Sequence, residues 1–407
     1  MGRSRGAGAA RAAVCLCLWL PTVAGATSPE RASRAAAVAA SNRFGFELYA
    51  RVKAGQGNVI CSPVSASIAL TMTWAGARGE TEREMARVLA LGPRDPKATH
   101  AAFAALLDTL NRRNGHEGLT LYVADRLWGQ RHFAFRPDFL RLLSDRYRAP
   151  LELVDFIDAT EEARTAINRW AATQTHDRVR EILQPGILDD QTRLVLTNAV
   201  YLKAAWGQKF EKEQTADGYF TTPAGQVVAK MMHKEGNYRY ARVRDAQLLE
   251  LDYRGDLSMV VVLPDSANDL EAVEGRLAGN YRAWLEALGS KRVELALPRW
   301  KGSSSLKLSE VLKAMGMPRA FSPEVANFTG ISRQPLFIAH VLQEAFVDVD
   351  EGGTEAAAVT AVVTVKASAV LPAVPPIPFH ADHPFLYLIR DKTTGVVLFI
   401  GRVVDPR

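Results

Sequence analysis

Residues 353–384 read G-T-E-A-A-A-V-T-A-V-V-T-V-K-A-S-A-V-L-P-A-V-P-P-I-P-F-H-A-D-H-P. Between 356 and 365 this stretch carries no charge and is rich in Val and Thr, which favour β-strands. The prolines at 372–378 favour extended backbone and exclude a central strand or a helix there. A connection of about 30 residues is unusual in a compact domain, and such loops tend to be functional or disordered. The first half therefore has the composition of a strand within the bounds of a loop.

The two faces of this segment differ when it is laid out as a strand, because successive side chains point to opposite sides. One face takes only small or β-branched uncharged residues, which are Thr354, Ala356, Ala358, Thr360, Val362 and Thr364. The other face includes Glu355, the one charge before Lys366. An exposed segment of this kind is an aggregation hazard. The segment is therefore either a permanent strand or one that exchanges between loop and strand.

The rest of the chain predicts a mixed α+β fold with large, mostly antiparallel sheets. Apolar residues have helical spacing at 103–110 and at 308–315, where Gly316 ends the second pattern. Strand-like runs lie at 193–202, 257–263, 346–349, 384–389 and 396–404. No repeat and no long linker divides these elements. We expect one large domain over residues 41–407.

The N-terminus has the pattern of a secretory signal peptide over residues 1–26. Basic residues come first, an apolar stretch follows, and the small residues Ala24-Gly25-Ala26 precede the cleavage point. The leader holds three basic residues, so three of the six net positive charges of the 407-residue chain leave with it. The remaining charge is too mild to indicate nucleic-acid binding. We expect a short tether over residues 27–40 and a secreted protein, or a periplasmic one in a bacterium.

Motifs for catalysis and metal binding are absent from the sequence. There is no G-x-S-x-G, H-E-x-x-H, phosphate-binding loop or C-x-x-C, and the pair His380 and His383 lacks a third metal ligand. Cys61 is the one cysteine outside the leader, so no internal disulfide forms in the mature chain. No apolar run has the length of a membrane-spanning helix. The sequence predicts no enzyme, no metal, no cofactor and no membrane partner.

Three further segments carry a more specific signal. Residues 58–72 read N-V-I-C-S-P-V-S-A-S-I-A-L-T-M, residues 196–206 read L-T-N-A-V-Y-L-K-A-A-W, and residues 351–358 read E-G-G-T-E-A-A-A. They resemble, in order, the start of the central helix beneath sheet A, a central strand with the breach tryptophan, and the proximal hinge of inhibitory serpins. Residues 257–265, 383–391 and 398–406 resemble strands of the second sheet and the C-terminus of that family. The resemblance extends from about residue 42 to 406.

The resemblance implies a serpin fold, with three β-sheets, eight to nine helices and a reactive-centre loop at about 353–383. In inhibitory serpins a protease cuts this loop and forms an acyl-enzyme, and the cut loop inserts into sheet A as a new strand. The chain is thus expected to be a suicide-substrate inhibitor of a serine protease, and a monomer prone to loop–sheet polymerisation. The alternative is a non-inhibitory serpin that acts as a carrier, chaperone or storage protein.

The resemblance also implies which residues control insertion. The hinge residues are Glu351, Gly353, Thr354, Glu355, Ala356, Ala357 and Ala358. The shutter and breach residues are Ser62, Ser65, Asn198, Trp206 and Gln343. Gln343 stands where many family members have His, and Gln still both donates and accepts hydrogen bonds. We expect Thr354 to be the first side chain that insertion buries.

The scissile bond is less sharply defined than the hinge. Counting from the hinge in the family's usual way places it at Ala367-Ser368, and Ala367 suits the narrow pocket of an elastase-like protease. A shift of one residue gives Lys366 and a trypsin-like target. Counting back from Pro384 leads to Val370 or later, because the proline-rich part varies in length.

Overall fold

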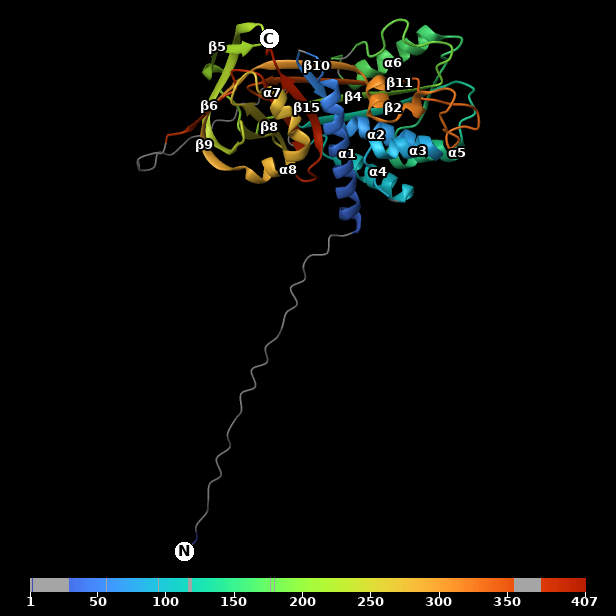
Figure 1. Cartoon of the computed structure of the whole chain (residues 1–407), viewed down its shortest axis with the longest axis horizontal. Coiled ribbons are helices and arrows are strands. Elements are labelled where there is room, and N and C mark those ends of the chain that lie inside the picture. Colours follow the sequence, from blue (N-terminus) through green and yellow to red (C-terminus); the bar gives the residue numbers. More distant parts are fainter. Residues whose placement is uncertain are drawn as a thin grey trace.

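The structure is a computed structural model that describes Gly2, 29–354 and 375–407, except residues 56, 94, 116–118, 176 and 179. Within these ranges it contains nine α-helices and two hydrogen-bonded β-sheets (Figure 1). The predicted α+β class and the number of helices are confirmed. Two of the three expected sheets are joined into one, because the 19-residue strand β6 (Gly225–Val243) pairs with β5 at one end and with β7 at the other. The predicted leader lies outside the described residues, apart from Gly2.

The smaller sheet, sheet A below, has six strands, and the predicted strands at 193–202 and 346–349 belong to it. Its order is β10 (Trp300–Lys307), β11 (His340–Asp350), β12 (Gly353–Thr354), β4 (Leu194–Ala205), β2 (Thr120–Gln130) and β3 (Glu152–Val154). Strands β11 and β4 run parallel and pair directly between His340–Phe346 and Val195–Tyr201. This pairing is called the seam below. Parallel pairing is slightly less stable per residue than antiparallel pairing, and the long neighbours on both sides of the seam are antiparallel.

The larger sheet contains the other predicted strands. Its order is β1 (Val59–Cys61), β15 (Val397–Val403), β14 (Phe385–Asp391), β8 (Leu257–Pro264), β7 (Ala246–Asp252), β6, β9 (Gly289–Pro298) and β13 (Ile377–His380), with β5 (Thr215–Thr222) on β6. Strands β8 and β14 are almost wholly buried, which explains their continuous apolar sequence. The strands predicted at 257–263, 384–389 and 396–404 are thereby confirmed.

The α-helices include both of the helical patterns expected from the sequence. They are α1 (Pro29–Val52), α2 (Pro63–Trp74), α3 (Gly79–Val88), α4 (Pro96–Asn111), α5 (Pro137–Leu142), α6 (Thr160–Gln174), α7 (Leu270–Gly275), α8 (Leu277–Ala287) and α9 (Leu308–Met315). A π-helical turn spans Leu143–Tyr147, and 3-10 turns span Lys212–Gln214 and Pro318–Phe321. Gly316 ends α9 in the left-handed region, at φ 112°.

The predicted tether is wrong for residues 29–40, because they form the first half of α1. Ala37, Val38 and Ala40 are buried in the main core, so this segment packs against the domain. The sequence pattern was misleading because the alanine-rich stretch has almost no amphipathic contrast, and small side chains still pack closely.

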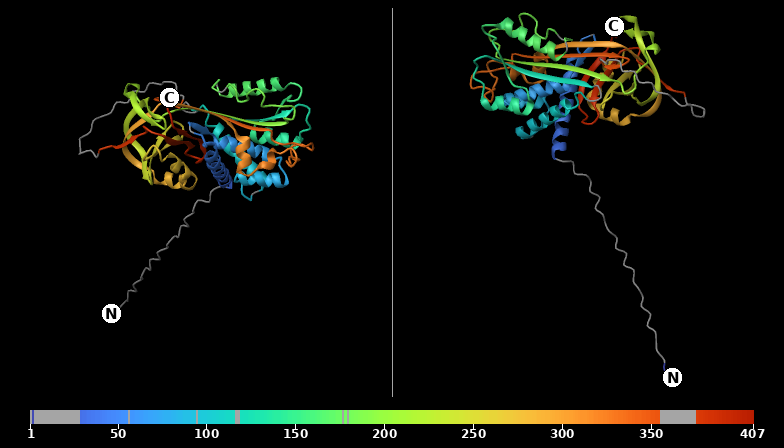
Figure 2. Two further views of the ribbon diagram at one scale, coloured as in Figure 1. Left: turned by 45° about the horizontal axis from the view of Figure 1, so that its top comes forward. Right: turned by 180° about the vertical axis from the view of Figure 1, so that it is seen from behind.

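Helices cover both faces of sheet A. All twelve residues of α2 are buried, and the helix lies under β4 and β2 (Figure 1). Helix α6 packs on the opposite face, where Ile167 and Ala171 belong to the same buried cluster as Trp128 and Val195 (Figure 2). If β4 and β11 separate, β4 must therefore move across the buried surface of α2. In the described part of the chain, no helix is long and apolar enough to cross a membrane.

Candidate functional site

The hinge begins inside sheet A. Strand β12 consists of Gly353 and Thr354, and it lies between β11 and β4 at one end of the seam. Thr354 is the register partner of Val349 on β11 and of Ala204 on β4. The seam itself is closed below this point by direct β11–β4 pairing. Two residues of the 353–384 segment are therefore already seated in the gap that a longer strand would extend.

Gly353 is required by the geometry of this entry. Its φ is +143°, and a Cβ atom built there would lie 2.1 Å from the carbonyl oxygen of Ala204. Thr354 is fully buried, and its Oγ1 lies 2.6 Å from the hydroxyl of Tyr253. The expectation that insertion begins by burying Thr354 is wrong, because this side chain is buried before any cut. The remaining predicted hinge and reactive-bond residues, Glu355, Ala356, Ala357, Ala358, Lys366, Ala367 and Ser368, lie outside the described residues.

Trp206 contacts the turn that leads into the hinge. Its ring stacks on Tyr253 with centroids 4.3 Å apart and an interplanar angle of 7°. The indole Nε1 donates to the carbonyl oxygen of Asp350 at 2.9 Å, and the backbone N–H donates to the carbonyl oxygen of Gly352 at 2.9 Å. These contacts hold both sides of the turn between β11 and β12.

Glu351 anchors the same turn to the larger sheet. Its carboxylate accepts hydrogen bonds from Arg299 Nε at 2.6 Å and from Thr215 Oγ1 at 2.5 Å. Burial raises the pKa of Glu351, but hydrogen bonds from Thr215 and Arg299 outweigh it, so the net pKa lies below the ordinary value. The carboxylate is therefore ionised at neutral pH and fixes the start of the hinge.

The predicted shutter residues meet at the start of α2. Gln343 of β11 accepts from the backbone N–H of Ser62 at 2.8 Å and donates to the carbonyl oxygen of Ser62 at 2.9 Å. Both residues are fully buried. The side-chain amide thus satisfies two backbone groups at the helix start. Trp206 lies at the other end of β4, next to the hinge.

The second half of the cluster depends on Asp125, which the sequence analysis missed. Oδ1 of Asp125 on β2 accepts from Ser65 Oγ at 2.5 Å and from Asn198 Nδ2 at 3.0 Å. Asp125 and Asn198 are cross-strand partners, and Ser65 belongs to α2. Burial raises the pKa of Asp125 to about 7, and the hydrogen bonds from Ser65 and Asn198 act in the opposite direction.

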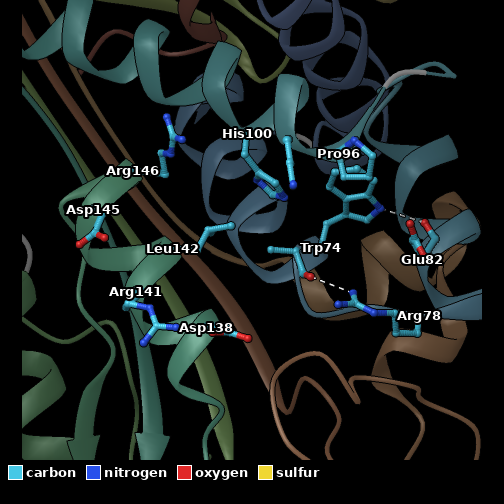
Figure 3. Close-up of a pocket in the computed structure, with 12 residues that line it drawn as sticks. Trp74, Arg78, Glu82, Pro96, His100, Asp138, Arg141, Leu142, Asp145 and Arg146 are labelled. Atoms are coloured by element: carbon cyan, nitrogen blue, oxygen red, sulfur yellow. Dashed lines mark hydrogen bonds and ion pairs between the residues drawn. The ribbon is translucent and has the colours of Figure 1, made fainter.

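A cavity of about 600 Å³ opens to solvent in the helical layer at the end of α2 (Figure 3). Trp74 and His100 lie side by side in it, with ring centroids 5.3 Å apart. His100 Nδ1 is 2.7 Å from the hydroxyl of Tyr147, and burial, with a smaller effect of Arg146, lowers the His100 pKa to about 4. None of the described residues lining this cavity is a serine, threonine or cysteine, so it offers no hydroxyl or thiol nucleophile.

The arrangement defines a class of protein in which a short strand, β12, separates two parallel strands of sheet A at one end of their seam. The sequence model described as Serpin (serine protease inhibitor) matches residues 39–406. The chain therefore belongs to the serpin family.

Relatives and solved structures agree with this assignment. An uncharacterized serpin-like protein of Thermococcus kodakarensis is 40% identical, over 91% of this chain and 86% of its own length. The leukocyte elastase inhibitor of Xenopus tropicalis is 37% identical, over 90% of this chain and 98% of its own. The crystal structure of Serpin48 from the insect Tenebrio molitor matches with a TM-score of 0.81 and 30% identity, over 94% and 100% of the two chains.

Replacing Gln343 with Ala is expected to destabilise the protein by about 2–4 kcal/mol. The N–H of Ser62 would lose its buried partner, and the C=O of Ser62 would keep only the bond from the Ala66 N–H at 3.3 Å. Urea unfolding followed by circular dichroism measures the change. The matched control is Gln191→Ala, since the Gln191 side chain is exposed and bonds only its neighbour Asp190. Equal losses for the two variants would contradict the assigned role of Gln343.

Proposed function

We propose that the protein is a suicide-substrate inhibitor of serine proteases that traps its target by inserting the cut loop into sheet A. The observation that carries the proposal is β12, which already occupies the mouth of the β4–β11 seam. The residues that follow Thr354 are small or β-branched and uncharged on the face that would continue inward. A strand started in this way needs only to be extended.

The chemistry belongs to the protease. Its serine Oγ attacks the carbonyl carbon of the scissile residue, the C–N bond breaks, and the amine of the next residue leaves with a proton from the general acid of the protease. The protease is then bound through an ester to the new C-terminal end of the loop. Insertion of residues beyond 354 moves this ester away from the site of cleavage before water hydrolyses it.

Apolar burial and backbone pairing supply the driving force. At about 25 cal/mol per Å² of apolar area, one buried face of a dozen residues contributes several kcal/mol, and new sheet hydrogen bonds add to it. The competing step is ester hydrolysis, so the outcome depends on how fast the seam opens. Gln343 and Asp125 are the groups that join the two sides of the seam to α2.

The target is proposed from the loop sequence. Cleavage at Ala367-Ser368 favours an elastase-like protease, which agrees with the name of the leukocyte elastase inhibitors that this chain resembles. Cleavage after Lys366 would instead select a trypsin-like enzyme. We propose secretion from the leader pattern of residues 1–26.

Incubation with one elastase-like and one trypsin-like protease tests the function. The expected result is an adduct that survives denaturing electrophoresis, together with a released C-terminal peptide beginning at Ser368. A protease with its active-site serine blocked serves as the control and should form no adduct. Cleavage without any adduct would reject inhibition and support the carrier, chaperone or storage alternative.

A further inference from the structure

Asp125 lies where the two halves of sheet A are attached to α2. A strand can enter the seam only if β4 separates from β11, and β4 is tied to β2 through ten register pairs. Gln343 attaches β11 to Ser62, whereas Asp125 attaches β2 and Asn198 of β4 to Ser65, three residues further along the chain. The carboxyl of Asp125 therefore holds the side of the sheet that has to move.

The hydrogen bonding of this carboxyl is incomplete. Both of its donors bond Oδ1, while Oδ2 is inaccessible to solvent and has no hydrogen-bond partner among the described residues. Within the same part of the chain, Asn198 Oδ1 and Ser62 Oγ of this cluster also lack a partner. Asp125 as a whole is half-buried. A carboxylate whose Oδ2 is closed to solvent and unpaired is still costly, whereas the protonated acid keeps both bonds to Oδ1 and removes the charge. The closed sheet thus favours the protonated form.

Among the described residues, few other titratable groups lie against Asp125. Helix α2 carries no titratable side chain. Asp125 also lines a cavity of about 330 Å³, where α4 and α6 contribute only uncharged side chains; the charged or titratable groups there are Tyr122, Arg126, Tyr147 and Arg148. Arg126 forms a salt bridge with Glu152, with 3.2 Å between Nη1 and Oε2. Lys203 and Tyr201 lie further along β4, and across the seam β11 carries His340 and Glu344.

We propose that Asp125 is a proton-dependent positioning residue: its protonated carboxyl holds β2 and β4 on α2, and loss of the proton releases them and speeds strand entry into the seam. The proposal rests on the insertion function proposed above. Separation of β4 from β11 would bring water to Ser65, Asn198 and Asp125, so the open sheet accommodates the carboxylate better than the closed one.

The direction of the pH effect follows from linkage. Burial in the closed sheet raises the pKa of Asp125 to about 7, and hydration in the open sheet returns it toward the ordinary value of an aspartate. The closed form therefore binds the proton more tightly, and its advantage falls as pH rises between these two values. Opening becomes easier with rising pH and levels off above about pH 7.

The test uses the intact protein and a synthetic peptide of residues 354–365 with Glu355 replaced by Gln, so that the probe itself does not titrate. The rate at which this peptide anneals into sheet A is followed by native electrophoresis from pH 5 to 8.5. We expect the rate to rise roughly tenfold between pH 5.5 and 7.5 and then to level off. Asp125→Asn should anneal at the slow, low-pH rate throughout, because its neutral side chain still accepts through Oδ1.

Two further variants separate this effect from others. Glu344→Gln removes the other acid near the seam. Burial raises the pKa of Glu344 to about 7 as well. The variant should nevertheless keep the pH dependence of the annealing rate. Ser65→Ala removes one hydrogen bond that favours the carboxylate, so it should move the midpoint of the profile to higher pH. A purely structural role of Ser65 would change the rate without moving the midpoint.

Each outcome has a fixed meaning. A flat wild-type profile, a slope that survives in Asp125→Asn, or a slope that disappears in Glu344→Gln would overturn the proposal for Asp125. Failure of the peptide to anneal at every pH would instead reject strand insertion, and the proposed function with it. Covalent-adduct formation at a single pH, measured on the same samples, distinguishes the two failures.

Discussion

Replacing Thr354 with Arg is expected to convert the protein from an inhibitor into a substrate. Thr354 is fully buried between β11 and β4 and contacts the Tyr253 hydroxyl. An unpaired charge in this position costs several kcal/mol, so β12 would leave the sheet and extension would lose its starting strand. The scissile bond lies about 13 residues away, so the rate of cleavage should change little. We expect the stoichiometry of inhibition to rise at least about tenfold.

Two variants serve as controls for Thr354→Arg. Thr354→Ser keeps the hydroxyl that faces Tyr253 and should inhibit nearly as well as the wild type. Glu355→Arg places the same new side chain on the neighbouring residue, which alternation puts on the outward face of an inserted strand, and it should also inhibit nearly as well as the wild type. Titration of a protease with each variant measures the stoichiometry. Wild-type inhibition by Thr354→Arg would sink the proposal that extension of β12 stops the protease.

Cleavage between Val365 and Val370 by a protease that is not trapped should raise the melting temperature by about 10 °C or more. The cut would free residues beyond 354 to extend β12, which adds a paired and partly buried strand to sheet A. Differential scanning calorimetry of intact and nicked protein measures the shift. Nicked Thr354→Arg is the matched control and should melt close to its intact form. Equal melting of intact and nicked wild type would favour a permanent strand or a loop that never inserts.

The fold could be predicted in outline because the apolar pattern is strong in most long elements. The buried strands β8 and β14 and the helix α9, with its terminal Gly316, follow directly from local sequence. The first half of α1 could not be recognised, because its burial depends on close packing of alanines against distant helices. The joining of two sheets through β6 was also inaccessible, since pairing partners of one long strand are set by tertiary contacts.

The candidate site was predicted unevenly for a similar reason. Ser62, Ser65, Asn198 and Gln343 meet as the family resemblance implied. The position of Asp125 could have been noticed in the sequence, because Leu121, Val123 and Leu127 place it on the buried face of its strand. Carboxyl groups are rare on such a face unless they are paired or have a specific role. No feature of the sequence indicated that Thr354 is already buried in the intact protein. This burial follows from the positive φ of Gly353, which turns the chain into the gap beside Ala204.

The buried, charge-free surface of α2 has a consequence for kinetics. Its twelve residues are small, aliphatic or hydroxyl-bearing apart from Met72 and Trp74, so strands moving across it exchange one set of dispersion contacts for another at little net cost. Resistance to that movement is then concentrated in a few polar bonds at one end of the helix. A barrier built in this way responds steeply to single atoms, since each 1.4 kcal/mol changes a rate by about tenfold. Natural variation at two or three positions would set the time that a captured enzyme has to escape.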